Sequence, residues 1–188
     1  KESIGNGVLV VLNDEINAAR EVTKTNTSSV DTFKSRNTGA IGRVYYGKVV
    51  YSTKSLKKHT ANSVFDVSKL EALPRVDIIY SHANDNPDFV NVAVKNGAKG
   101  IVSAGLGNGN PYFSVLEALG EASKAGVVVV RDSRVGSGET TMNGEVDDAK
   151  YGFLTSDNLN AQKVRVLLML ALTKTSDKAK IQEFFLTH

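Results

Sequence analysis

The chain contains two different patterns of apolar and polar residues, and the more regular pattern begins near residue 75. Three short apolar runs predict buried strands, over residues 76–80, 100–104 and 127–130. The segments between these runs have the apolar spacing of helices, over residues 88–96 and 112–125. Fully apolar strands that alternate with helices are typical of a parallel sheet covered on both faces, so this part of the chain predicts an α/β domain.

Two more helices are predicted near the C-terminus. Residues 159–173 are very apolar, and Asn160 is the expected N-cap of this helix. Residues 177–185 predict a last helix, capped by Thr175 or Ser176.

The first part of the chain has shorter and less regular elements. Residues 8–12 form a continuous apolar run that predicts a buried strand, and residues 15–21 predict a short helical turn. Two alternating segments, 43–46 and 49–52, predict a β-hairpin with its turn at Gly47-Lys48.

Residues 53–74 show no steady period and predict a linker. They contain a basic cluster, Lys54, Lys57, Lys58 and His59. Such a run of charge is typical of a solvated surface segment. The expected organisation is therefore a first domain, a linker and a second domain, at residues 1–52, 53–74 and 75–188.

Composition narrows the chemistry. The chain of 188 residues has no cysteine, which excludes disulfides, cysteine-bound zinc, iron–sulfur clusters and thiol nucleophiles. Its net charge of +3 is too small to predict a nucleic-acid partner. The longest apolar run, residues 166–172, is too short to cross a bilayer, so no membrane association is expected.

The carboxyl ends of parallel strands are where open sheets bind ligands, and the loop 105–110 follows one predicted strand. Its sequence, Gly-Leu-Gly-Asn-Gly-Asn, resembles a dinucleotide-binding loop but has Asn110 where the third glycine should stand. The amides of Asn108 and Asn110 fit a small polar ligand better. The alternative is that these two amides only bond to their own turn.

Two other groups of residues could carry chemistry. Lys24 stands among hydroxyl and amide side chains and could accept a proton from a hydroxyl, or it could be an exposed loop lysine. Glu145, Asp147 and Asp148 form an acidic cluster that could hold an ammonium group or a metal. The three histidines, at 59, 82 and 188, are far apart in sequence, which disfavours a histidine-based metal site.

Several longer runs together resemble one known family, the bacterial type II L-asparaginases. They occur in the family's order along essentially the whole chain. The matching runs cover residues 7–14, 22–27, 58–60, 65–70, 100–110 and 161–173. The most specific are Val-Thr-Lys-Thr-Asn-Thr around Lys24 and Gly-Leu-Gly-Asn-Gly-Asn, which ends at Asn110.

The resemblance implies a fold, an activity and roles for three residues. The fold would be a partial N-terminal α/β domain with a hairpin, a linker and a flavodoxin-like C-terminal domain. The activity would be hydrolysis of L-asparagine to L-aspartate and ammonia, with glutamine a weaker substrate and no cofactor or metal. Lys24 would be catalytic, in a triad with a threonine and an aspartate, whereas Asn110 and Glu145 would bind substrate held by a neighbouring subunit.

The family's two threonine motifs, Gly-Gly-Thr-Ile and His-Gly-Thr-Asp-Thr, do not occur in this sequence. We therefore expect the chain alone to be inactive and to need the N-terminal region of the same protein as its partner. The resemblance also implies a homotetramer with active sites shared between subunits, and it favours the periplasm over the cytoplasm. From the residues alone, the alternative is a non-catalytic α/β module that binds a small ligand or a nucleotide.

Overall fold

The computed structural model describes all residues, 1–188, as two compact units. The first unit contains residues 1–63 together with His188, and the second contains residues 64–187. The α/β class, with a hairpin in the first unit and a parallel sheet in the second, agrees with the sequence prediction.

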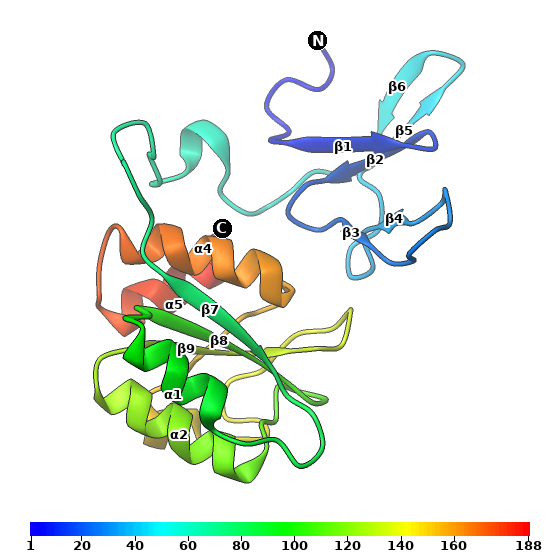
Figure 1. Ribbon diagram of the computed structural model, residues 1–188. Helices are drawn as coiled ribbons and strands as arrows, with labels where there is room; N and C mark the ends of the chain where they lie inside the picture. Colours follow the sequence, from blue (N-terminus) through cyan, green and yellow to red (C-terminus); the bar gives the residue numbers. More distant parts are fainter. The chain divides into compact units, whose positions relative to one another are not determined.

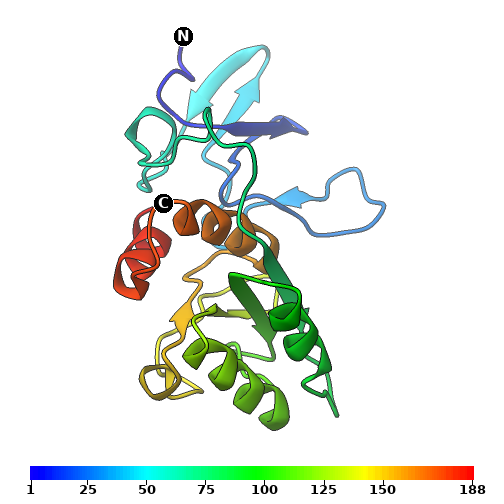
Figure 2. The ribbon, with the colours of Figure 1, turned by 60° about the vertical axis from the view of Figure 1, so that its left-hand side comes forward.

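The first unit is built on a four-stranded antiparallel sheet with the order β1-β2-β5-β6. The strands of this unit are drawn as blue and cyan arrows in Figure 2. Its strands are β1 (Leu9–Leu12), β2 (Glu15–Ala18), β5 (Gly42–Tyr45) and β6 (Lys48–Tyr51). A second, two-stranded sheet pairs β3 (Thr23–Lys24) with β4 (Phe33–Lys34). A small core of Ile16, Ala18 and Ile41 stabilises this unit.

The predicted hairpin is present, with its turn one residue earlier than expected. Tyr45 pairs with Lys48, so Tyr46 and Gly47 form the turn. Both have positive φ, 46° and 77°, which is the backbone of a type I′ turn and matches the twist of the flanking strands.

Two predictions for the first unit are wrong. Glu15 to Ala18 form a strand instead of a helical turn, because Asn13 and Asp14 adopt positive φ and close a tight hairpin between β1 and β2. The run around β1 is also less buried than predicted, with Val11 53% and Leu12 41% exposed. As the first strand in the sheet order, β1 pairs only with β2 and has no neighbour on its other side.

The segment predicted as a linker contains no strand. Its one regular element is the short 3₁₀ helix η1 (Thr60–Asn62), and the division between the two compact units falls after Ser63.

The second unit contains a four-stranded parallel sheet. The strands follow the chain without reversal, β7-β8-β9-β10, whereas a flavodoxin sheet reverses its order once. They are β7 (Val76–Tyr80), β8 (Gly100–Gly105), β9 (Val128–Ser133) and β10 (Leu154–Thr155). The prediction missed β10 and the short helix α3 (Asp148–Tyr151) that precedes it.

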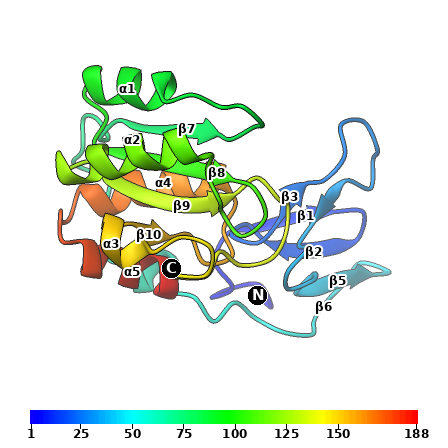
Figure 3. The ribbon, with the colours of Figure 1, turned by 90° about the horizontal axis from the view of Figure 1, so that it is seen from below.

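Helices cover both faces of this sheet, as predicted (Figures 1 and 3). One face packs against α1 (Asp88–Lys95) and α2 (Phe113–Lys124), and the other packs against α4 (Ala161–Leu172) and α5 (Lys178–Thr187). Successive residues of a strand point to opposite faces, so Val129 belongs to one core and Val130 to the other.

The ends of α4 and α5 test the predicted caps. Asn160 caps α4, because its side chain accepts a hydrogen bond from the backbone N–H of Lys163 at 3.2 Å. The cap predicted for α5 is wrong by one or two residues. Asp177 accepts from the N–H groups of Ala179 and Lys180, and its carboxylate also suits the positive end of the helix dipole.

Candidate functional site

Two loops meet at the carboxyl edge of the parallel sheet, and the first of them follows β8. Leu106 and Asn110 close this loop by exchanging backbone hydrogen bonds of 2.9 and 2.8 Å. Gly107 and Gly109, inside the loop, have positive φ of 50° and 76°. The loop is therefore a tight closed turn, and two of its backbone N–H groups, which a phosphate-binding loop would offer to its ligand, are already used.

A buried ion pair is hydrogen-bonded to the backbone of this loop. Arg131, in β9, and Asp148, at the start of α3, are both completely buried, and Arg131 is the largest fully buried side chain of the protein. The guanidinium donates two hydrogen bonds to the carboxylate, from Nε to Oδ1 at 2.5 Å and from Nη2 to Oδ2 at 2.7 Å. Bidentate, charge-assisted pairs of this kind are the strongest side-chain hydrogen bonds.

The remaining donors of Arg131 bind backbone carbonyls on two loops. Nη1 donates to the carbonyls of Asn108 at 2.8 Å and Gly109 at 3.2 Å, whereas Nη2 donates to that of Thr141 at 3.0 Å. The carboxylate of Asp148 also accepts from the N–H of Asn143 at 2.7 Å. One buried pair thus fixes the loop after β8 and the segment before α3 at the same time.

A second connection joins the same two segments nearer the surface. Asn108 Nδ2 donates to the hydroxyl of Thr141 at 2.6 Å, and Asn108 Oδ1 accepts from the Thr141 N–H at 2.9 Å. The sequence left open whether Asn108 bonds its own turn, and its side chain reaches instead to a residue 33 positions away.

Close packing leaves no room for side chains at two glycines of the site. A Cβ on Gly109 would lie 2.9 Å from Nη1 of Arg131, and one on Gly144 would lie 2.6 Å from the hydroxyl of Thr141. The small residues are therefore needed for the two segments to approach each other.

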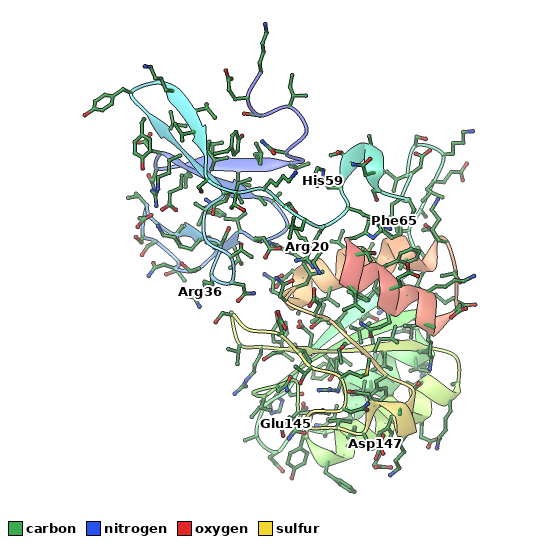
Figure 4. All side chains as sticks on the ribbon, turned by 180° about the vertical axis from the view of Figure 1, so that it is seen from behind. Arg20, Arg36, His59, Phe65, Glu145 and Asp147 are labelled. Atoms are coloured by element: carbon green, nitrogen blue, oxygen red, sulfur yellow. The ribbon has the colours of Figure 1, made fainter.

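The three acids predicted as one cluster have three different environments. Asp148 is buried against Arg131, and Asp147 caps α3 by accepting from the N–H of Lys150 at 3.0 Å. Glu145 is exposed and has no partner within the chain. Figure 4 shows Glu145 and Asp147 on this segment of the second unit, and only Glu145 keeps a carboxylate free for a ligand.

The structure places two of the three predicted site residues on these connected segments. Asn110 is the last residue of the closed turn, next to the Gly109 carbonyl that Arg131 holds, and its side chain is exposed. Glu145 lies between Asn143 and Asp148, which are themselves hydrogen-bonded. An exposed amide and an exposed carboxylate at this edge can bind a polar ligand that carries an ammonium group.

Lys24, the third predicted residue, lies in the first unit. It is exposed at the end of β3, pairs with Phe33 in register, and its Nζ is 5.8 Å from the centre of the Phe33 ring. The loop beyond it is closed by Thr32, which accepts from Thr25 through its carbonyl and from the Asn26 N–H through its hydroxyl. The Lys24 ammonium group has no acid partner in this chain.

A buried acid on the opposite face of the sheet is separate from this site. Asp132 is only 2% exposed; its Oδ1 accepts from the Ser156 hydroxyl at 2.7 Å, and its Oδ2 has no hydrogen-bond partner. Burial raises the pKa of Asp132 to about 6, although hydrogen bonds from Ser156 and Ser133 act in the other direction. Burial and the charge of Asp132 also raise the pKa of Tyr80.

Arg131 and Thr141 are the functional candidates that sequence reasoning missed. The available signal was an arginine that directly follows four valines, residues 127–130, since an arginine buried in such a strand needs an acid partner. None of the helices of the protein is long and apolar enough to cross a membrane.

Comparison with known proteins agrees with this architecture. A sequence model of the glutaminase/asparaginase C-terminal domain matches residues 75–185, and a model of the N-terminal asparaginase domain matches residues 1–57. The first match alone covers more than half of the chain. The chain belongs to the glutaminase/asparaginase family.

Individual relatives are similar over nearly the whole chain. L-asparaginase 2 of Escherichia coli is 53% identical over 98% of this chain, and the probable periplasmic L-asparaginase of Haemophilus influenzae is 51% identical over the same share. A glutaminase-asparaginase of Pseudomonas fluorescens is 40% identical. The chain spans only about half the length of these relatives, 53%, 53% and 51% respectively.

Because Asp132 is buried, we expect the free energy of unfolding to fall as the pH rises and this carboxyl group becomes charged. Its pKa is about 6 in the folded state against an ordinary value of 3.8, so the folded protein binds this proton more tightly than the unfolded chain. Protonation of Asp132 therefore stabilises the folded protein. This contribution to the free energy of unfolding is complete below pH 3.8 and is lost as the pH rises to about 6. We expect Asp132→Asn, which keeps an acceptor for Ser156, to raise the free energy of unfolding at pH 7.5 by about 1–3 kcal/mol.

Urea unfolding at pH 7.5 and at pH 4 measures this effect, and Glu139→Gln, at an exposed acid, is the control for a lost surface charge. The gain should be present at pH 7.5 and small at pH 4. An equal gain at both pH values would contradict the assignment of the proton to Asp132.

Proposed function

We propose that this chain forms part of an L-asparaginase, which hydrolyses L-asparagine to L-aspartate and ammonia. Water replaces nitrogen at the side-chain amide carbon, and the nitrogen leaves as ammonia. Glutamine, longer by one methylene, would be a weaker substrate. In this proposal the catalytic threonines come from the N-terminal region of the same protein, and this chain contributes Lys24, Asn110 and Glu145.

The observation that carries the proposal is the free carboxylate of Glu145, held on a segment that is tied to the loop of Asn110. Both side chains are exposed, at the sheet edge where parallel α/β folds bind ligands. A carboxylate that has no internal partner can accept a hydrogen bond from the α-ammonium group of asparagine. Asn110 can orient either that carboxylate or the substrate through its amide.

Lys24 has a different role in this proposal. Its exposed ammonium group at the end of β3 has no acid partner in the chain, so it can contact a threonine hydroxyl outside the chain. The proton transfer requires this lysine in its neutral amine form, which accepts the hydroxyl proton and leaves the oxygen, or a water bound to it, able to attack the amide carbon. The backbone next to Lys24 is held by two hydrogen bonds from Thr25, through its N–H and its hydroxyl, to the carbonyl of Thr32.

The proposal also includes an assembly, suggested by the resemblance to the family, and a compartment, suggested by one relative. We propose a homotetramer in which each active site combines the N-terminal domain of one subunit with Asn110 and Glu145 of a neighbour. The relative from Haemophilus influenzae is named as periplasmic, which supports the same compartment for this protein.

Replacing Glu145 tests the proposed ammonium contact. A charge-assisted hydrogen bond contributes about 1.5–3 kcal/mol, so Glu145→Ala in the complete enzyme should raise KM for asparagine about ten- to hundredfold. Ammonia release at varied asparagine concentration measures the change. Glu139→Ala, which removes an exposed carboxylate from the same segment, is the matched control and should leave KM unchanged. Equal effects of the two variants would refute the contact.

Replacing Lys24 tests the proposed proton transfer. Lys24→Met keeps most of the side-chain volume and removes the base, so kcat should fall by at least about a hundredfold while aspartate still binds with nearly the parent affinity. Lys54→Met, at another exposed lysine, should behave as the parent enzyme. Turnover of the Lys24 variant within about tenfold of the parent would make Lys24 an ordinary surface lysine.

A further inference from the structure

The buried pair of Arg131 and Asp148 does not itself face solvent or a ligand, yet both segments that carry the substrate-binding candidates are attached to it. Arg131 has five N–H donors, and the structure uses five hydrogen bonds from them. Two donors bind the carboxylate of Asp148, and three bind carbonyls of the loop after β8 and of Thr141.

We infer that Arg131 and Asp148 are positioning residues, which hold Asn110 and Glu145 in the single arrangement that binds the α-ammonium group of the substrate. This inference rests on the proposed function. It adds two buried residues that never contact the substrate and that determine how well the other two do.

The position of each contact supports this role. Asn110 directly follows Gly109, whose carbonyl accepts from Arg131. Glu145 lies in a stretch of six residues, 143–148, whose two ends are joined by the hydrogen bond from the Asn143 N–H to the Asp148 carboxylate. Neither segment can shift without breaking a hydrogen bond to a fully buried, charged group.

Stability alone is a weak reason for such a pair. Taking two charges out of water is unfavourable, and a protein in which well-packed apolar residues replace such a pair is often at least as stable. The pair is therefore better explained by the specific structure that it imposes. The planar guanidinium has five donors and can bind Asp148 and carbonyls on two segments at the same time. A lysine ammonium group has only three donors and is not planar. Asn108 and Thr141 repeat the connection with two more hydrogen bonds, 2.6 and 2.9 Å.

A double-mutant cycle between Asp148 and Glu145 tests the inference in the complete enzyme. Asp148→Asn keeps the shape of the side chain and weakens its hold on Arg131. A small displacement of a binding group costs about tenfold to a hundredfold, so we expect KM for asparagine to rise within that range while kcat changes little. In the Glu145→Ala background the same substitution should have a much smaller further effect on KM, because only Asn110 is left for the pair to position.

A second substrate separates positioning from general damage. Succinamic acid, which is asparagine without its α-amino group, cannot use the ammonium contact. Its hydrolysis should therefore respond little to Asp148→Asn, whereas a merely structural role would reduce the hydrolysis of both compounds by the same factor.

A third variant covers the case in which Asp148→Asn does not fold, as judged by its thermal unfolding. Asn108→Ala removes only the outer connection to Thr141 and leaves the buried charges paired, and it should show the same pattern to a smaller extent. The parent enzyme is measured first. A parent without asparaginase activity overturns the proposed function and this inference with it, whereas an active parent with additive losses in the cycle, or with equal losses for both compounds, overturns the inference alone.

Discussion

The candidate site depends on one constraint, a guanidinium and a carboxylate that are both removed from water. A charge in that position must be paired and hydrogen-bonded, and Arg131 satisfies the requirement with Asp148 and with carbonyls from two segments. The backbone conformations of the segments that carry Asn110 and Glu145 are therefore coupled, because both segments are bound to the same buried pair. The positions of the exposed side chains of Asn110 and Glu145 thus depend on the buried pair of Arg131 and Asp148.

The alternation of side chains along β9 separates two acids that would otherwise compete for Arg131. Arg131 lies at an odd position, with Val129 and the helices α1 and α2, whereas Asp132 shares the face of Val130 and α4. Asp148 therefore receives the guanidinium, while Asp132 has only neutral hydrogen-bond donors, and burial raises its pKa to about 6. Neighbouring residues of one strand thus belong to different electrostatic environments.

Much of the fold could be predicted from the sequence, because the apolar runs of β7, β8 and β9 and the helices between them follow directly from periodicity. The strand β2 was missed because Asn13 and Asp14 adopt a left-handed turn, and this turn chemistry outweighed the helical spacing. Within the site, the three acids 145, 147 and 148 look alike in sequence. Which of them turns inward depends on Arg131, 17 residues from Asp148, and local pattern carries no information about that contact. The resemblance pointed to Glu145, and the structure adds why it is the free one.

The central claim is that one buried pair fixes two segments together, and hydrogen exchange of individual backbone amides tests it without any assay of activity. The variant Arg131→Lys keeps the charge of Arg131 and loses the flat set of five donors. The account predicts that exchange at the amides of Asn110 and Asn143 becomes faster together, while amides in the middle of β8 keep the parent rate. Faster exchange at only one of the two amides, with the other unchanged, would contradict it.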